Sequence, residues 1–145
     1  MECFGGNGYD ENFDAARIYR QAPLNAIWEG SSNVIALDVL RALNRDPSDG
    51  AAFFAYLESA SGKDARYDAR LAAASRSPPP EEGARAYADD LARLLCGAAL
   101  LENGDPAVAA AYCAGRLGPD SAATYGAADL GGREAALLDR LCAPG

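Results

Sequence analysis

The chain has 145 residues, of which 50% are hydrophobic, and it carries a formal net charge of −8 at pH 7. A chain of this length has room for one domain with a single core. Alanine is abundant and β-branched residues are scarce, which favours helices over strands. The acidic balance opposes nonspecific attraction to DNA or to anionic membrane surfaces.

Residue types that are missing exclude several classes of site. The sequence contains no histidine, and its 4 cysteines form no C-x-x-C pair, so we expect no metal site. Catalysis by Ser-His-Asp or Cys-His groups is excluded for the same reason. Cys96 and Cys113 lie among alanine and leucine residues, and we interpret both as small core residues rather than as nucleophiles.

Targeting and membrane signals are also missing from the sequence. No apolar run approaches the length of a membrane span, and the N-terminus has no basic segment followed by a hydrophobic one. We therefore expect a cytoplasmic protein that has no membrane partner.

The first motif in the chain is a glycine loop, Gly5-Gly6-Asn7-Gly8. Because glycine adopts positive φ easily, such a loop by itself is typical of a helix end followed by a turn. It does not follow a predicted strand, so the dinucleotide-binding fingerprint of a Rossmann fold is not supported.

Residues 10–22 are predicted to form a helix with an apolar stripe. Pro23 is expected to end this helix and to push Ala22 towards an extended conformation, so that residues 24–28 form a short extended link. We interpret Arg17 and Arg20 as ion-pairing residues of the helix, and a role in orienting a cofactor or the neighbouring loop ranks second.

The extended link leads to Glu29, which lies between the apolar pair Ile27-Trp28 and a hydroxyl-rich turn that begins with Gly30. Hydrophobic neighbours disfavour the charged form of a carboxylate, and a following glycine lets a ligand approach the backbone; both are features of a catalytic base. From the residues alone, however, a carboxylate beside a tryptophan is more often an ordinary surface acid. Both interpretations stay open at this point.

A long helix is predicted to begin at Ser31 or Ser32, whose hydroxyls are natural N-caps. The N-terminus of such a helix offers amides and partial positive charge to an anionic group, although a plain capping turn has equal weight. The apolar positions cover a broad face, as expected of a helix packed on two sides: Val34, Ile35, Leu37, Val39, Leu40 and Leu43.

Further helices complete an all-α fold, a bundle of about six helices. The next helix is predicted to begin at Asp46-Pro47, with Asp46 as its cap and a core face of Phe53, Phe54, Tyr56 and Leu57. The others are predicted at residues 63–75, 81–103, 107–117 and 133–142, with a break at residues 77–80 and a looser stretch at residues 118–132. The Asp105-Pro106 pair is predicted to cap the helix at residues 107–117 in the same way as Asp46-Pro47. The best amphipathic spacing lies in residues 81–103, at Tyr87, Leu91, Leu94, Leu95, Ala98 and Leu101.

The order of the N-terminal motifs, GGNGY and then ARIYRQAPLNAIWEGSSNVIALDVLRAL, resembles the C-terminal helical domain of the flavin-dependent acyl-CoA dehydrogenases. The Trp-Glu-Gly-Ser motif before Asn33 and the Leu-Asp-Val-Leu-Arg run look most like the AidB-like (alkylation-response) branch. The resemblance is close from Glu2 to about Leu43 and only general afterwards. It divides the chain into a family segment at residues 1–45 and a helical extension at residues 46–145.

The resemblance implies roles for particular residues. Glu29 would be the catalytic base, which removes the α-proton of an acyl-CoA thioester while hydride passes to FAD, and Trp28 would wall the substrate pocket. A glycine loop that packs against FAD held by a neighbouring subunit, and the start of the long helix, would supply the cofactor contacts: Gly5, Gly6, Gly8, Ser31 and Asn33.

The resemblance also implies that the chain is incomplete. An acyl-CoA dehydrogenase has an N-terminal helical domain, a central β-domain and a C-terminal helical domain, and the resemblance covers about the last half of the third. We therefore expect a truncated gene product or a split subunit, whose partner is either the missing domains or a homo-oligomer. It should expose an apolar surface where the absent helices would pack, and FAD should need those domains in order to bind.

Three functions stay open. The first is a fragment of an FAD-dependent oxidoreductase that acts on CH–CH groups of acyl-CoA once it is completed. The second is a non-catalytic helical module that uses the former flavin face to contact a partner. The third is an AidB-like, DNA-protecting flavoprotein, which is disfavoured because residues 46–145 hold more acidic than basic side chains, so nucleic acid is not an expected partner.

Overall fold

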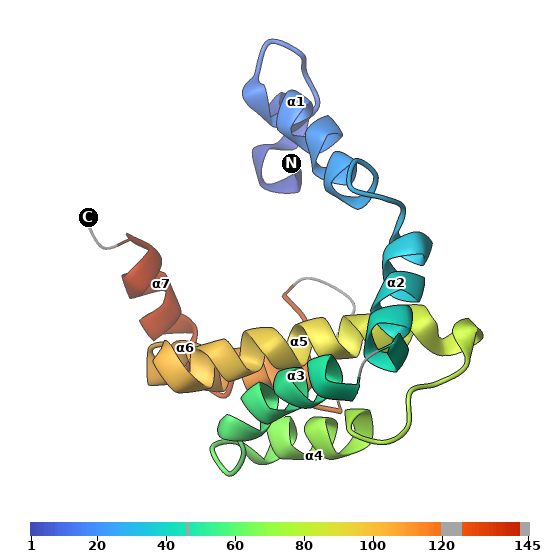
Figure 1. Ribbon diagram of the computed structural model, residues 1–145. Helices are drawn as coiled ribbons and strands as arrows, with labels where there is room; N and C mark the ends of the chain where they lie inside the picture. The colour runs from blue at the N-terminus through green and yellow to red at the C-terminus, as the bar shows by residue number, and fades with distance from the viewer. Residues whose placement is uncertain (46, 120–125, 143–145) are drawn as a thin grey trace.

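The computed structural model describes residues 1–45, 47–119 and 126–142. These residues form α-helices, 3-10 turns and one π-helical turn without any strand, which confirms the all-α fold class. No helix in these ranges combines the length and the apolarity needed to cross a membrane. Figure 1 shows a helical bundle from which the N-terminal residues extend, and we call residues 1–35 the arm.

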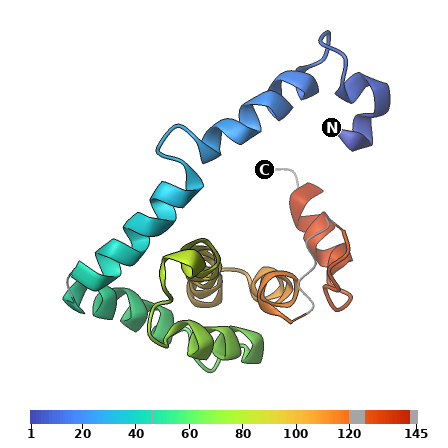
Figure 2. The ribbon, with the colours of Figure 1, turned by 90° about the vertical axis from the view of Figure 1, so that its right-hand side faces the viewer.

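The bundle is built around one central helix, α5 (Ala84–Asn103). Figure 2 views α5 end-on, with other helices around it. The elements that pack against α5 are α2 (Ser32–Arg45), α3 (Pro47–Ser59), α4 (Ala65–Ala74), α6 (Pro106–Tyr112), the 3-10 turn η3 (Glu81–Gly83) and the π-helical turn η4 (Cys113–Leu117).

Spacing in the sequence explains why α5 is central. Of the positions predicted to be apolar contacts, four are buried on this helix: Tyr87, Leu91, Leu94 and Ala98. Leu101 is half-buried, whereas Leu95, also predicted to be in the core, is 41% exposed. Because each residue turns an α-helix by about 100°, Leu95 lies at the edge of the face on which Leu94 and Ala98 are buried.

Two buried tyrosines pack in the core of the bundle, and the hydroxyl of each has a hydrogen-bond partner. The Tyr67 hydroxyl donates to the carbonyl of Leu57 at 2.7 Å, and the Tyr87 hydroxyl donates to the carbonyl of Ala74 at 3.2 Å. Burial raises the pKa of Tyr67 to about 12, so this side chain stays a neutral donor at physiological pH. Gly97 lets α5 approach the ring of Tyr67 closely, because a Cβ at this position would lie 3.1 Å from that ring.

Aspartate caps fix where two of the helices begin. Asp64 accepts the backbone amides of Arg66 and Tyr67, so α4 begins at Ala65 and not at residue 63 as predicted. Asp105 accepts the amides of Ala107 and Val108 and caps α6 as predicted. Asp46, the predicted cap of α3, lies outside the described residues.

On α3 the predicted core face is only partly correct. Leu57 is fully buried, and the half-buried rings of Phe53 and Phe54 meet edge to face with centroids 5.6 Å apart. Tyr56 is 41% exposed, so its assignment to the core is wrong. The phenol can keep its polar end in water there, which removes the need for a buried partner.

The C-terminal helix α7 (Glu134–Cys142) packs on α6 and is joined to its cap by an ion pair between Arg140 and Asp105 at 2.9 Å. Leu138 and Leu141 of α7 are exposed. The looser stretch predicted at residues 118–132 contains no helix among its described residues, and residues 120–125 lie outside the described ranges.

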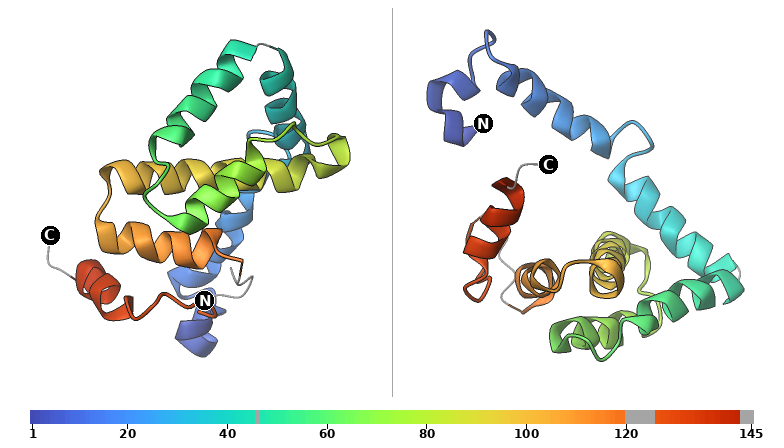
Figure 3. Two further views of the ribbon diagram at one scale, coloured as in Figure 1. Left: turned by 90° about the horizontal axis from the view of Figure 1, so that it is seen from below. Right: turned by 90° about the vertical axis from the view of Figure 1, so that its left-hand side faces the viewer.

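The arm contains the 3-10 turn η1 (Glu2–Gly8), helix α1 (Asp14–Gln21) and the 3-10 turn η2 (Ala22–Ala26). The right view of Figure 3 shows from a further side that these elements lie away from the bundle. Helix α1 begins at Asp14 and not at residue 10, because the Asp10 side chain accepts the amide of Asn12 at 2.8 Å and Phe13 is extended. This hydrogen bond forms a local turn that competes with the helix.

The predicted extended link at residues 24–28 is wrong. Ala22 has helical angles and keeps its hydrogen bond to the carbonyl of Ile18, so the chain runs directly from α1 into η2. Pro23 occupies the first turn of η2, where its missing amide hydrogen costs no bond within the helix. The usual preference for an extended residue before proline is therefore overridden.

Helix α2 joins the arm to the bundle, and its two halves differ in packing. Ala36 and Leu40 are buried against the bundle, whereas Val34 and Ile35 in the first turn are exposed. The helix begins at Ser32 as predicted, but the broad packing expected along its whole length is found only towards its C-terminal end.

Replacing Leu94 by alanine tests the central role of α5. Leu94 is fully buried, so Leu94→Ala should lower the free energy of unfolding by about 2–5 kcal/mol through lost contacts and a cavity. Urea denaturation followed by circular dichroism measures the change. Leu141→Ala is the control, because Leu141 is 81% exposed and its truncation should change stability by less than about 0.5 kcal/mol. Equal losses in the two variants would contradict the assignment of the core.

The Asp105 cap predicts a dependence of stability on acid pH. Hydrogen bonds from Ala107 and Val108, and then the charge of Arg140, hold the pKa of Asp105 below its usual value. Because the pKa is lower in the folded state, the stabilisation is present above about pH 4 and is lost as the pH falls through the folded-state pKa. Asp105→Asn keeps a capping oxygen but cannot titrate, so its melting temperature should fall less on acidification. Parallel melting profiles for the variant and the unchanged chain would contradict this prediction.

Candidate functional site

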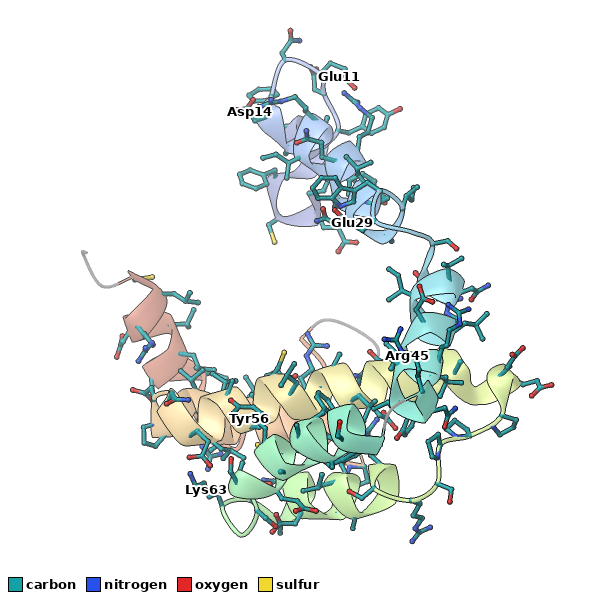
Figure 4. The ribbon with its side chains drawn as sticks, viewed as in Figure 1. Glu11, Asp14, Glu29, Arg45, Tyr56 and Lys63 are labelled. Atoms are coloured by element: carbon teal, nitrogen blue, oxygen red, sulfur yellow. The ribbon has the colours of Figure 1, made fainter. Side chains whose placement is uncertain are left out.

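Glu29 lies in the turn between η2 and α2, where its side chain is exposed. Figure 4 places it on the arm with Glu11 and Asp14, away from the labelled bundle residues. The turn depends on Gly30, whose φ of +118° is rarely adopted by residues that carry a side chain. The glycine therefore sets the direction in which the chain enters α2 after Glu29.

The apolar neighbours of Glu29 do not enclose it within this chain. Ile27 is 64% exposed and Trp28 is 67% exposed. If Trp28 forms one wall of a substrate pocket, as the resemblance implies, the remaining walls must come from outside the described residues of this chain. The predicted catalytic role of Glu29 is neither supported nor opposed by its local geometry, and it stays a prediction.

The start of α2 lies directly after Glu29. The Ser31 carbonyl accepts the amide of Ile35 at 3.1 Å, which begins the helical hydrogen bonding, and Ser31 and Asn33 are both exposed. The first amides of a helix have no partner within it and can donate to an anionic group. The structure thus brings together Glu29 and two of the predicted cofactor-contacting residues at one exposed junction.

The glycine loop has two kinds of glycine. Gly5 has a φ of +54°, and a Cβ added at Gly5 or Gly6 would meet no heavy atom within 4 Å, so the backbone there is open to a ligand. Gly8 is different, because a Cβ there would lie 2.3 Å from the carbonyl oxygen of Met1. Gly8 is therefore needed for the packing of η1, whereas the space around Gly5 and Gly6 is open.

The glycine loop is separated from Glu29 by α1 and η2 (Figure 2). Gly6 lines an open hollow between η1 and α1 that does not include Glu29. The other residues that line this hollow are Met1, Tyr9, Asp10, Glu11, Ala16, Tyr19 and Arg20. The predicted site residues therefore form two groups on the arm and not one pocket.

Ion pairs account for both arginines of α1, as predicted. Arg17 pairs with Asp14 at 3.2 Å, and Arg20 forms a two-point contact with Glu11, one branch of which measures 2.9 Å. The hydrogen bonds from Arg20 hold the pKa of Glu11 below its usual value. The contact closes the loop that precedes α1, a pairing that spacing along a single helix did not predict.

The bundle carries an apolar groove that the sequence prediction did not identify. It has a volume of about 350 Å³ and lies where α2, α3 and α5 meet. The signal in the sequence is the series Ala88, Ala92 and Leu95, which repeats at helical spacing beside the core face of α5. The residues that line the groove are Val39, Ala42, Leu43, Phe53, Ala88, Leu91, Ala92 and Leu95.

The two cysteines that we assigned to the core have different environments. Cys113 is fully buried in η4, and burial raises the pKa of its thiol to about 11. Cys96 is exposed, so its assignment to the core is wrong. It follows Leu94 by two positions on α5 and therefore faces nearly the opposite side of the helix.

Comparison with known proteins places these features in a family context. Residues 1–44 match the family model of the acyl-CoA dehydrogenase C-terminal domain. The putative acyl-CoA dehydrogenase AidB of Escherichia coli (strain K12) is 39% identical over 116 residues, which are 78% of this chain and 21% of AidB. Acyl-CoA dehydrogenase family member 11 of Caenorhabditis elegans is 38% identical over 71 residues, which are 49% of this chain and 12% of that protein.

A third relative, the mitochondrial isovaleryl-CoA dehydrogenase of Pongo abelii, is 46% identical over 46 residues. This match covers 32% of the chain and 11% of the relative. The chain thus spans about a fifth or less of the length of these relatives. The family match ends near the junction of α2 and α3, so it contains the whole arm and all of the predicted site residues.

The cysteines allow a direct chemical test of the structure. An alkylating reagent near neutral pH should modify Cys3, Cys96 and Cys142, which are exposed, and should spare Cys113 because its thiol is buried and its pKa is raised. Mass spectrometry of the peptides identifies the modified positions, and a sample unfolded in denaturant is the control in which all the thiols react. Rapid labelling of Cys113 in the folded chain would contradict the packing of η4 against α4 and α5.

Proposed function

We propose that this chain, which belongs to the acyl-CoA dehydrogenase family and is similar to AidB and to part of the family's C-terminal domain, forms part of an FAD-dependent oxidoreductase that acts on CH–CH groups. The observation that carries this proposal is the position of Glu29. It lies inside the family-matched segment, beside the open start of α2, on an arm whose apolar side chains are unpacked. Such a carboxylate is available to a site that other domains complete.

In the proposed reaction, Glu29 takes the proton from the α-carbon of an acyl-CoA thioester. When FAD is bound, it accepts the hydride that leaves the β-carbon, so that a double bond forms between the two carbons. Ser31, Asn33 and the first amides of α2 hold polar groups of the cofactor. Gly5 and Gly6 allow close approach of a flavin held by a neighbouring subunit, and Gly8 supports the loop from within.

The arm by itself cannot exclude water from the proposed site around Glu29. Ile27 and Trp28 are exposed in the segment that leads to Glu29, and an incoming domain would turn them into pocket walls. Exclusion of water strengthens the hydrogen bonds and charge interactions that act on the thioester. The proposal therefore assigns FAD binding and turnover to the completed assembly, in which residues 1–45 supply the site and residues 46–145 form an extension.

A non-catalytic interaction module is the second candidate, and the exposed apolar residues of the arm favour it. Protection of DNA is the weakest candidate, because the chain has an excess of acidic residues that repels phosphate. The cytoplasm is the location that we propose, as the sequence prediction did. Absorbance in the flavin bands, measured with FAD on the chain alone and on the completed assembly, separates the first two candidates.

The Glu29→Gln variant tests the catalytic proposal. The chain is combined with the N-terminal and β-domains of an AidB-like protein, and acyl-CoA-dependent flavin reduction is measured. Loss of the base should slow the reaction by about 10²–10⁴-fold while the flavin absorbance of the assembly stays the same. Glu11→Gln is the matched control, because Glu11 pairs with Arg20 on the surface of the same arm. An unchanged rate in Glu29→Gln would remove Glu29 from the mechanism.

A further inference from the structure

The chain exposes more surface than a compact protein of its mass. Its accessible area is 10083 Å² for 15.0 kDa. A compact monomer of this mass exposes about 7,000 Å². Two copies together therefore carry an excess of about 6,000 Å², which is more than enough for an obligate dimer, whose partners hide about 2,000–5,000 Å² in total.

Many large apolar side chains of the arm are exposed. Leu24, Ile27 and Trp28 are 48%, 64% and 67% exposed, and they lie in η2 and the turn that follows it, where the amides of Ile27 and Trp28 both donate to the carbonyl of Leu24. These two hydrogen bonds hold the three apolar residues in one compact exposed turn, which is a candidate for burial in a hydrophobic groove. Other large apolar residues of the arm are also exposed: Phe4, Tyr9, Phe13, Ile18, Tyr19, Val34 and Ile35.

The same chain offers the apolar groove of its bundle, at the meeting of α2, α3 and α5. The arm cannot reach this groove in its own copy, because α2 is a continuous helix that carries the arm away from the bundle (Figure 2). The rise of a helix puts Ser32 about 10 Å along the axis from Val39, which lines the groove. The buried residues Ala36 and Leu40 fix the direction of this helix.

We propose that the 145-residue chain by itself forms a closed two-fold dimer in which the Leu24–Trp28 segment of each copy lies in the groove of the other. The two-fold axis then relates two identical contacts. The arm segment and the groove of each copy are covered, and no groove stays free for a third copy. The inference concerns assembly of the chain with itself. It does not depend on flavin chemistry, so its failure and that of the proposed function are separate results.

Three variants of the full chain test this arrangement by light scattering after size exclusion. The unchanged chain should have twice the mass of 15.0 kDa. Ile27→Asp on the arm and Leu95→Asp in the groove should each shift the chain to the monomer mass, because each puts a charge into the apolar contact. Leu141→Asp, on the exposed side of α7, is the matched control and should leave the dimer intact.

Mixing the two disruptive variants tests whether the exchange is reciprocal. A pair of one Ile27→Asp chain and one Leu95→Asp chain keeps one intact arm and groove contact, so the mixture should recover a population of heterodimer. The single tryptophan gives a second signal, since the emission of Trp28 should shift to longer wavelength in Leu95→Asp although the arm is unaltered. Circular dichroism confirms that each variant keeps its helical content.

Several results would overturn the inference. One is a monomer mass for the unchanged chain at all concentrations up to about 100 μM. Another is a dimer that Leu95→Asp leaves intact, which would mean that arms pair with arms. A mixture of the two variants that stays fully monomeric, or an unchanged chain that forms open-ended assemblies, would also contradict a closed reciprocal dimer.

Discussion

The packing of α2 on α5 is the contact on which the rest of the structure depends. Ala36 and Leu40 are buried there, and α2 is the element that joins the arm to the bundle. Small and branched side chains at that contact allow the two helices to approach closely, and the single direction of α2 then places the arm. The bundle therefore holds the arm, which is itself weakly packed, in a defined position.

The family match and the packing divide the chain at different points, because nearly all of α2 lies in the matched residues although it packs on α5 of the bundle. Residues 1–44 match the acyl-CoA dehydrogenase C-terminal domain, and most of the large apolar side chains that remain uncovered lie in this range. The bundle that follows has a closed core with buried tyrosines whose hydroxyls are paired. A segment rich in exposed apolar residues is therefore attached to a bundle with a closed core, to which α2 also contributes Ala36 and Leu40.

Sequence reasoning succeeded where a local pattern determines the structure. The spacing of Tyr87, Leu91 and Leu94 predicted the central helix, and the Asp105-Pro106 pair predicted the start of α6. It failed where tertiary context decides, as for Cys96, whose apolar neighbours in sequence do not cover it in space. It also failed at Pro23, where a continuing 3-10 turn replaced the expected extended link. The candidate site could be located by motif, but the motif did not predict that Ile27, Trp28 and Glu29 are all exposed on the arm, because exposure depends on tertiary packing.

The continuity of α2 has a mechanical consequence. A helix of 14 residues is about 20 Å long, and it behaves as a stiff rod over that length. A tilt of its base by about 10° would therefore displace the far end by about 3–4 Å, which is the size of a hydrogen-bond distance. A change in how α2 sits on the bundle would thus be amplified at the Glu29 carboxylate, which lies just before the far end of the helix.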